Sequence, residues 1–242
     1  MMKNLTNMSC KFSAKKGFTL VEMAIVLVII GLFLTLFLSP LSAQKDMLNR
    51  DKTKVLFTQA KEALLGYAVV NRHLPCPDTK SVPNGAETRK SDGTCDKASG
   101  VLPWNTLGIE PVDAWERYFF YRVDTTFSNS TVLFTLTDAN SASGLEINDE
   151  NGAVTNTESR PVAIVLSFGK NGFGGKNTNQ SYPANQISAP SSVDELENVD
   201  GNVTFKNRAP SAQGSANEFD DMLVWISPKV LINRMIVAER LP

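Results

Sequence analysis

A single carboxylate stands inside the longest apolar run of the chain, and a charge in such a place needs a chemical reason. The run extends from Phe18 to Leu38, and Glu22 is its only charged residue. A charge deep in a bilayer costs about 2.5–3.5 kcal/mol on insertion scales and commonly has a function. Because Glu22 lies about one helical turn into the run, its side chain could instead reach the membrane interface and need no partner.

A cut between Gly17 and Phe18 would supply a positive partner for Glu22. The new α-amine would lie four residues before the carboxylate, close enough to neutralise it in the same chain or in a neighbouring copy. One buried ionic contact would then hold apolar helices in register as they pack beside one another.

The apolar run is long enough to cross a membrane, because Phe18–Leu38 spans about 30 Å as a helix. An ordinary secretory signal peptide fits less well, since its apolar region is about 7–15 residues long and ends at a small-x-small site. The best candidate site, after Ala43, has Leu41 at the −3 position. A plain single-pass anchor explains the length but not Glu22. The preceding residues contain no acid, which keeps that end in the cytoplasm, and their basic residues are Lys3, Lys11, Lys15 and Lys16.

The segment KKGFTLVE at residues 15–22 resembles the processing motif of type IV prepilins and type II secretion pseudopilins. In that family a basic leader ends in Gly, a membrane peptidase cuts after it and methylates the new N-terminal residue, and a Glu four residues later neutralises a neighbour's amine during assembly. The resemblance therefore implies a leader at residues 1–17, cleavage between Gly17 and Phe18, N-methylation of Phe18 and an assembly role for Glu22. The partners would be prepilin peptidase, other pilins or pseudopilins, an inner-membrane assembly platform and membrane lipid.

Helical periodicity continues beyond the apolar run. No proline stands between Pro40 and Pro75, so we expect one helix over residues 18–71, kinked at Pro40, or two helices that are separated there. Residues 18–39 would form the membrane-spanning and assembly half, and residues 40–71 an amphipathic half that belongs to a head of residues 40–242. The predicted apolar stripe of that half consists of Leu48, Lys52, Val55, Leu56, Ala60, Ala63, Leu64, Tyr67 and Val70.

Two cysteines fall in the part of the chain that would be exported. Cys76 and Cys95 have 18 residues between them, whereas Cys10 would leave with the leader. In an oxidising compartment such a pair is expected to form a disulfide. A metal or redox pair is the alternative, but it lacks C-x-x-C spacing and a supply of histidines, since His73 is the only one.

The rest of the head predicts an α+β fold in which the long helix packs on an antiparallel sheet of about four strands. Apolar or alternating runs predict strands at residues 118–123, 131–137, 161–168 and 222–227. Long polar loops are expected at 73–101, 139–159 and 174–213. A final helix should begin at Pro228 and end near Glu239, with an inward face of Val230, Leu231, Met235, Ile236 and Val237.

The head contains a second, looser resemblance. The stretch LPWNTLG at 102–108, followed by Asp113-Ala114-Trp115, is similar to the head of minor or accessory pilin-like proteins. The turn at 167–172 and the Phe219-Asp220-Asp221 segment before a strand fit the same set. This resemblance implies an accessory subunit and not a major fibre subunit.

Composition excludes several other functions. Of 24 basic residues four leave with the leader, so 20 remain against 25 acidic residues, and the exported net charge of −5 gives no reason to expect a nucleic-acid partner. The segment GKNGFGGK at 169–176 lacks the Gly and Ser/Thr positions of a phosphate-binding loop. Nucleophilic catalysis would have to use His73, and no nucleophile elbow accompanies it. We therefore expect no enzymatic activity and no cofactor.

Calcium is the one ion that the resemblance brings into consideration, because some pseudopilins bind it in acidic loops. The candidate oxygen ligands here lack EF-hand spacing, and they are Asp138, Glu146, Asp149 and Glu150.

The sequence thus predicts a structural pilin-like subunit of a type IV pilus or a type II secretion pseudopilus. It would wait in the bacterial inner membrane as a single-pass protein with its head in the periplasm. The alternative is a membrane-tethered periplasmic binding module that captures a surface, cargo or DNA and does not polymerise.

Overall fold

The computed structural model describes residues 17–140, 144–155, 160–178, 186–211, 214–215 and 217–241, with the side chains of 35–41 and 139–140 left aside. The predicted leader, up to residue 16, therefore lies outside the described residues, as do the side chains at the end of the predicted membrane-spanning half, residues 35–39. The chain divides into two units, Met1–Lys45 and Asp46–Pro242.

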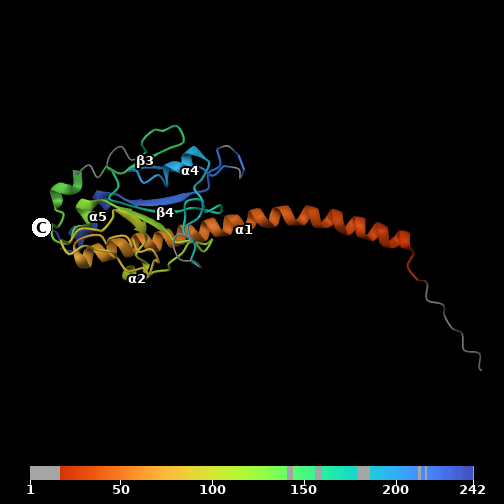
Figure 1. Ribbon diagram of the computed structural model, residues 1–242, viewed down its shortest axis with the longest axis horizontal. Coiled ribbons are helices and arrows are strands. Elements are labelled where there is room, and N and C mark those ends of the chain that lie inside the picture. Colours follow the sequence, from red (N-terminus) through yellow and green to blue (C-terminus); the bar gives the residue numbers. More distant parts are fainter. Residues whose placement is uncertain are drawn as a thin grey trace, which may run out of the picture. The chain divides into compact units, whose positions relative to one another are not determined.

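The long N-terminal helix is continuous. Helix α1 extends from Leu20 to Asn71 without interruption (Figure 1), so the prediction of one helix is confirmed and a break at Pro40 is not seen. Within the described residues, no helix is long and apolar enough to span a membrane.

The second half of α1 packs on the head through a stripe different from the predicted one. Leu48, Val55 and Val70 are exposed, so their expected inward position is wrong, whereas Ala60 and Leu64 are buried as expected. The buried face advances in steps of three and four residues through Thr53, Phe57, Ala60, Leu64 and Ala68, and Leu65 is buried beside it. A hydroxyl at Thr53 could take a core position because it donates to its own helix, to the carbonyl of Asn49 at 2.9 Å.

Four antiparallel strands form the main sheet. The sequence predicted an antiparallel sheet of about four strands, and this prediction is confirmed. Their order is β1 (Ser99–Val101), β2 (Phe120–Val123), β4 (Ala163–Ser167) and β6 (Met222–Ile226). Strand β1 lies in a segment predicted as loop, whereas β2, β4 and β6 fall within predicted strands.

Strand β4 is buried on both faces, which explains its continuous apolar run. Ala163 and Val165 face the core that contains α1 residues, and Ile164 faces a second cluster. Figure 1 shows β4 between α1 on one side and β3 and α4 on the other. The second cluster also contains Leu145, Ile147 and Phe205.

A small parallel sheet supports that second cluster and was not predicted. Strands β3 (Glu146–Asn148) and β5 (Thr204–Lys206) pair in parallel within segments expected to be polar loops. Helix α4 (Val193–Glu197) comes just before β5.

The strand predicted at residues 131–137 is wrong. The segment is irregular and leads into a 3₁₀ helix, η1 (Leu136–Asn140). Local side chains hold it in this form: Asn129 Oδ1 accepts from the N–H groups of Thr131 and Val132, and Asp138 Oδ2 accepts from the N–H of Thr135 at 2.7 Å. Such side-chain bonds compete with the hydrogen bonds of a β ladder.

The final helix is confirmed, but its inward face is rotated from the predicted one. Helix α5 (Pro228–Val237) begins after Ser227, whose Oγ accepts from the N–H of Val230. Its buried apolar side chains are Leu231, Ile232 and Met235. Val230, Ile236 and Val237 are exposed, so their predicted inward position is wrong. Two further short helices are α2 (Trp104–Leu107) and α3 (Thr125–Ser128).

Candidate functional site

The predicted processing site lies just outside the first turn of α1. Gly17, Phe18 and Thr19 are non-helical, and the helix begins at Leu20. The Phe18 side chain is exposed. The peptide bond between Gly17 and Phe18 is therefore not part of a helical hydrogen-bond ladder.

Glu22 has a structural role that the sequence analysis did not consider. Its Oε2 accepts hydrogen bonds from the N–H of Thr19 at 2.8 Å and from Thr19 Oγ1 at 2.9 Å, and its own N–H donates to Thr19 Oγ1 at 3.2 Å. This reciprocal arrangement is a capping box, in which Thr19 is the cap and Glu22 the third helical residue. The T-x-x-E spacing before an apolar run was the available sequence signal.

The first unit exposes its apolar side chains on every side of the helix. All described residues from Gly17 to Leu34 are exposed, and they include half of the large apolar side chains that are exposed among the described residues. Contiguous apolar surface of this extent is typical of an interaction surface. Glu22 is the only charged residue within it.

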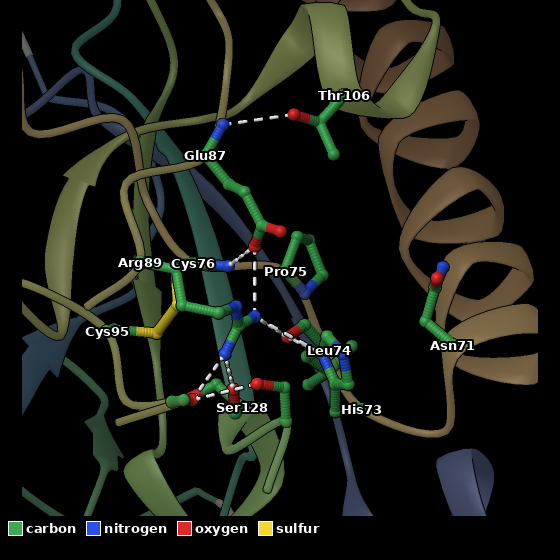
Figure 2. A network of polar contacts seen from close by, with 12 residues as sticks. Asn71, His73, Leu74, Pro75, Cys76, Glu87, Arg89, Cys95, Thr106 and Ser128 are labelled. Atoms are coloured by element: carbon green, nitrogen blue, oxygen red, sulfur yellow. Dashed lines mark hydrogen bonds and ion pairs between the residues drawn. A yellow bond between two sulfur atoms is a disulfide. The ribbon is translucent and has the colours of Figure 1, made fainter. Parts of the chain in front are cut away.

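At the other end of α1, an arginine joins three segments of the head. Figure 2 shows Arg89 among the chain after α1, the disulfide loop and the end of α3. Its Nη1 donates to the carbonyls of Gly93 at 2.8 Å and Ser128 at 2.6 Å, and its Nη2 donates to Glu87 Oε2 at 2.9 Å. Glu87 Oε2 also accepts from the N–H of Cys76 at 2.8 Å.

The disulfide expected between Cys76 and Cys95 is confirmed. It closes the loop that carries Glu87 and Arg89 (Figure 2). The covalent link and the ion pair therefore act on the same loop.

His73 belongs to this network. Its Nδ1 lies 3.0 Å from the carbonyl oxygen of Leu74 and 3.2 Å from Arg89 Nη2. Burial is the main reason that the pKa of His73 is lowered. Nearby, burial together with Glu87 raises the pKa of Tyr67 to about 12, and its hydroxyl donates to Glu87 Oε1 at 3.1 Å.

The Asp113-Ala114-Trp115 segment of the second resemblance forms a turn around the buried side chain of Asp113. Asp113 Oδ1 accepts from the N–H groups of Trp115 and Arg117, and Oδ2 accepts from Ser167 Oγ at 2.6 Å. The side chain thereby joins this turn to the end of β4. Burial raises the pKa of Asp113 although these hydrogen bonds oppose the shift.

The acidic residues first considered for calcium are not brought together. Asp138 caps η1, Glu146 pairs with Arg160 at 2.6 Å, and Asp149 Oδ1 accepts from the N–H groups of Asn151 and Ala153. Over the described parts of the chain, the group of acidic or other metal-ligating side chains that does converge is Glu195, Asp220 and Asp221. Asp220 and Asp221 are neighbours in the sequence, but Glu195 lies 25 positions before Asp220, so the sequence gave no signal that it joins them.

Comparisons with known proteins identify only the N-terminal segment. A family model described as the prokaryotic N-terminal methylation motif matches residues 12–38. No curated protein and no solved structure matches the chain. The matched segment contains the predicted cleavage site and Glu22. The chain thus carries the prokaryotic N-terminal methylation motif, which is consistent with the type IV pilin and pseudopilin family.

Proposed function

We propose that this chain is a structural pilin-like subunit that prepilin peptidase cuts after Gly17 and methylates at Phe18. The processed chain is held in the inner membrane by the first half of α1, with its head in the periplasm. It then joins other pilins or pseudopilins, on an inner-membrane platform, in a type IV pilus or a type II secretion pseudopilus. The observation that carries the proposal is the methylation motif at residues 12–38.

Two features of the described residues support this proposal. The apolar side chains that follow Phe18 are exposed on all sides of the helix, so a lipid environment or neighbouring helices must cover them. Glu22 is the one charge among them. In the assembled state this carboxylate pairs with the α-amine of Phe18 from a neighbouring copy.

The capping box gives Glu22 a competing role that mutations can separate from charge pairing. Glu22→Gln keeps an acceptor for the Thr19 N–H but removes the negative charge. Thr19→Val removes the hydroxyl that exchanges hydrogen bonds with Glu22 and keeps the charge. If charge pairing drives assembly, Glu22→Gln impairs it and Thr19→Val does not.

The processing step is tested by mass spectrometry of the mature N-terminus, in hosts with and without prepilin peptidase. We expect N-methyl-Phe18 in the first host and an intact leader in the second. An intact leader in both, or a terminus near Gln44, would reject the processing step. Incorporation is then measured in sheared filaments, where we expect Glu22→Gln to fall at least about tenfold while Thr19→Val stays near wild type. Normal incorporation of Glu22→Gln would remove the charge-pairing mechanism, and a processed wild type absent from filaments would favour the tethered binding module.

A further inference from the structure

Three carboxylates converge in the interior of the head, away from the processing site. Glu195 lies in α4, and Asp220 and Asp221 immediately precede β6. One oxygen of each lies within 4.8 Å of the others. Their side chains belong to residues that are only 2%, 7% and 5% exposed.

The hydrogen bonds around this cluster come from amides and not from cations. Asn171 Nδ2 donates to Glu195 Oε1 at 3.1 Å and its backbone N–H donates to Asp220 Oδ2 at 2.8 Å. Asn198 Nδ2 donates to Asp221 Oδ2 at 2.8 Å. Among the described residues, no lysine or arginine forms an ion pair with these three carboxylates.

Two buried oxygens in the cluster receive no hydrogen bond. Asp221 Oδ1 and Asp220 Oδ1 have no donor among the described groups. A buried carboxylate oxygen without a hydrogen-bond donor destabilises the folded state, and the cost in free energy is larger when the carboxylate is ionised. Asp221 is the stronger case, because it is only 5% exposed and its carboxylate has a single amide as its hydrogen-bond partner.

The charges around the cluster add to this cost. Burial raises the pKa of Asp221 well above its usual range, and the neighbouring Glu195 and Asp220 raise it further. Glu218 acts in the same direction on Glu195 and Asp220, whereas Arg50 partly offsets the shift at Asp220. A cation bound among the three carboxylates would supply the partner that Asp220 Oδ1 and Asp221 Oδ1 lack.

The ligand chemistry and the spacing fit a hard divalent cation. Carboxylate oxygens are the ligands that Ca²⁺ prefers, at about 2.3–2.6 Å, so two oxygens on opposite sides of the ion lie about 5 Å apart. Mg²⁺ requires a tighter and more regular shell. We propose that Glu195, Asp220 and Asp221 bind one divalent cation of the calcium class, which ties α4 to the start of β6. This proposal does not depend on filament assembly.

The test measures cation-dependent stability of the purified full chain in mild detergent, after treatment with a chelator. We expect 1 mM Ca²⁺ to raise the melting temperature of the head by on the order of 5 °C. Equilibrium dialysis with ⁴⁵Ca²⁺ should give one ion per chain, and Mg²⁺ at the same concentration should bind more weakly.

The variant Asp221→Asn separates a cation site from a purely structural contact. Its amide oxygen still accepts from Asn198, while its NH₂ can donate toward the neighbouring carboxylates. We expect this variant, in chelator, to melt at or above the temperature of the wild type and to show no response to Ca²⁺. Asp149→Asn and the exposed Glu110→Gln are matched controls that keep the full response.

Three results would overturn the proposal. The first is a wild-type chain whose melting temperature is unchanged by Ca²⁺ and that retains no ion on dialysis. The second is an Asp221→Asn variant that responds as the wild type does. The third is loss of the response in Asp149→Asn alone, which would place the ion at the loop first considered.

Discussion

At the scale of single residues, Glu22 has one observed role, in the helix cap, and one proposed role, in charge pairing. Its position as the only charge in an apolar run predicted charge pairing. Its capping contact with Thr19 was recognised only once the structure showed that the helix begins at Leu20. The disulfide between Cys76 and Cys95 was predictable because two cysteines in a head that is expected to be exported have few alternatives to pairing. The convergence of Glu195 with Asp221 could not be predicted, because it depends on how α4 packs near β6.

Arg89 is the residue for which the structure makes the sharpest prediction about stability. Replacing it with methionine removes its hydrogen bonds to Glu87, Gly93 and Ser128 and leaves Glu87 half-buried without its ion-pair partner. We expect Arg89→Met to lower the free energy of unfolding by about 3–4 kcal/mol. Arg89→Lys should recover only a minor part, since an ammonium cannot reach all of these acceptors at once.

Urea denaturation of the oxidised full chain measures the effect of both Arg89 variants. The exposed Arg240→Met serves as a matched control and should stay within about 0.5 kcal/mol of wild type. An Arg89→Met variant as stable as the control would mean that the network in Figure 2 contributes little to folding.

At the scale of elements, the sequence predicted best where an element is buried along its whole length. Strand β4 is covered on both faces, so its residues form the continuous apolar run from which the strand was predicted. The pair β3 and β5 was missed because each strand places one central side chain, Ile147 or Phe205, into the second cluster. The buried faces predicted for α1 and α5 were partly wrong, because apolar residues such as Val55 and Ile236 are exposed. Periodicity alone does not determine which of two adjacent apolar stripes is buried.

The disulfide loop is the element whose contribution can be measured most directly. Cys76 and Cys95 are separated by 19 positions, and closing a loop of this size stabilises the folded state by about 3 kcal/mol in the chain-entropy model. We expect the double variant Cys76→Ser/Cys95→Ser to lose about that amount in urea denaturation.

Reduction provides the control for the disulfide prediction. A reducing agent should lower the stability of the wild type to the level of the double variant and leave the variant unchanged. A double variant that matches oxidised wild type would show that the contacts of Glu87 and Arg89 hold the loop without the covalent link.

At the scale of the whole molecule, the two units differ in whether they contain buried side chains. The unit Met1–Lys45 has no buried side chain among its described residues, and every buried residue that the structure describes falls within Asp46–Pro242. The sequence predicted this division from the contrast between the apolar run and the mixed composition that follows it. A consequence is that the titratable groups with raised pKa values belong to the second unit, where they control how its stability depends on pH.

We expect five buried carboxylates to make the head more stable in mild acid than at neutral pH when no divalent cation is present. Burial raises the pKa in each of them: Asp113, Asp124, Glu195, Asp220 and Asp221. A group whose folded-state pKa is raised stabilises the fold below that pKa, and the contribution is lost as the pH rises through it. His73 has a lowered pKa and acts in the opposite sense, since its contribution is lost as the pH falls below about 6.5.

Because one histidine opposes five carboxylates, we expect the free energy of unfolding in chelator to increase as the pH falls from 8 to 5. Urea denaturation across this range measures the change, and its slope is bounded by about 1.4 kcal/mol per pH unit for each proton taken up on folding. Asp221→Asn should make the free energy of unfolding depend less on pH. Ca²⁺ should also reduce this dependence, because it stabilises the ionised cluster near pH 8. A stability that instead rises steadily with pH in chelator would mean that the carboxylates are ionised in the folded head without a cation, and that His73 or surface ion pairs dominate its titration.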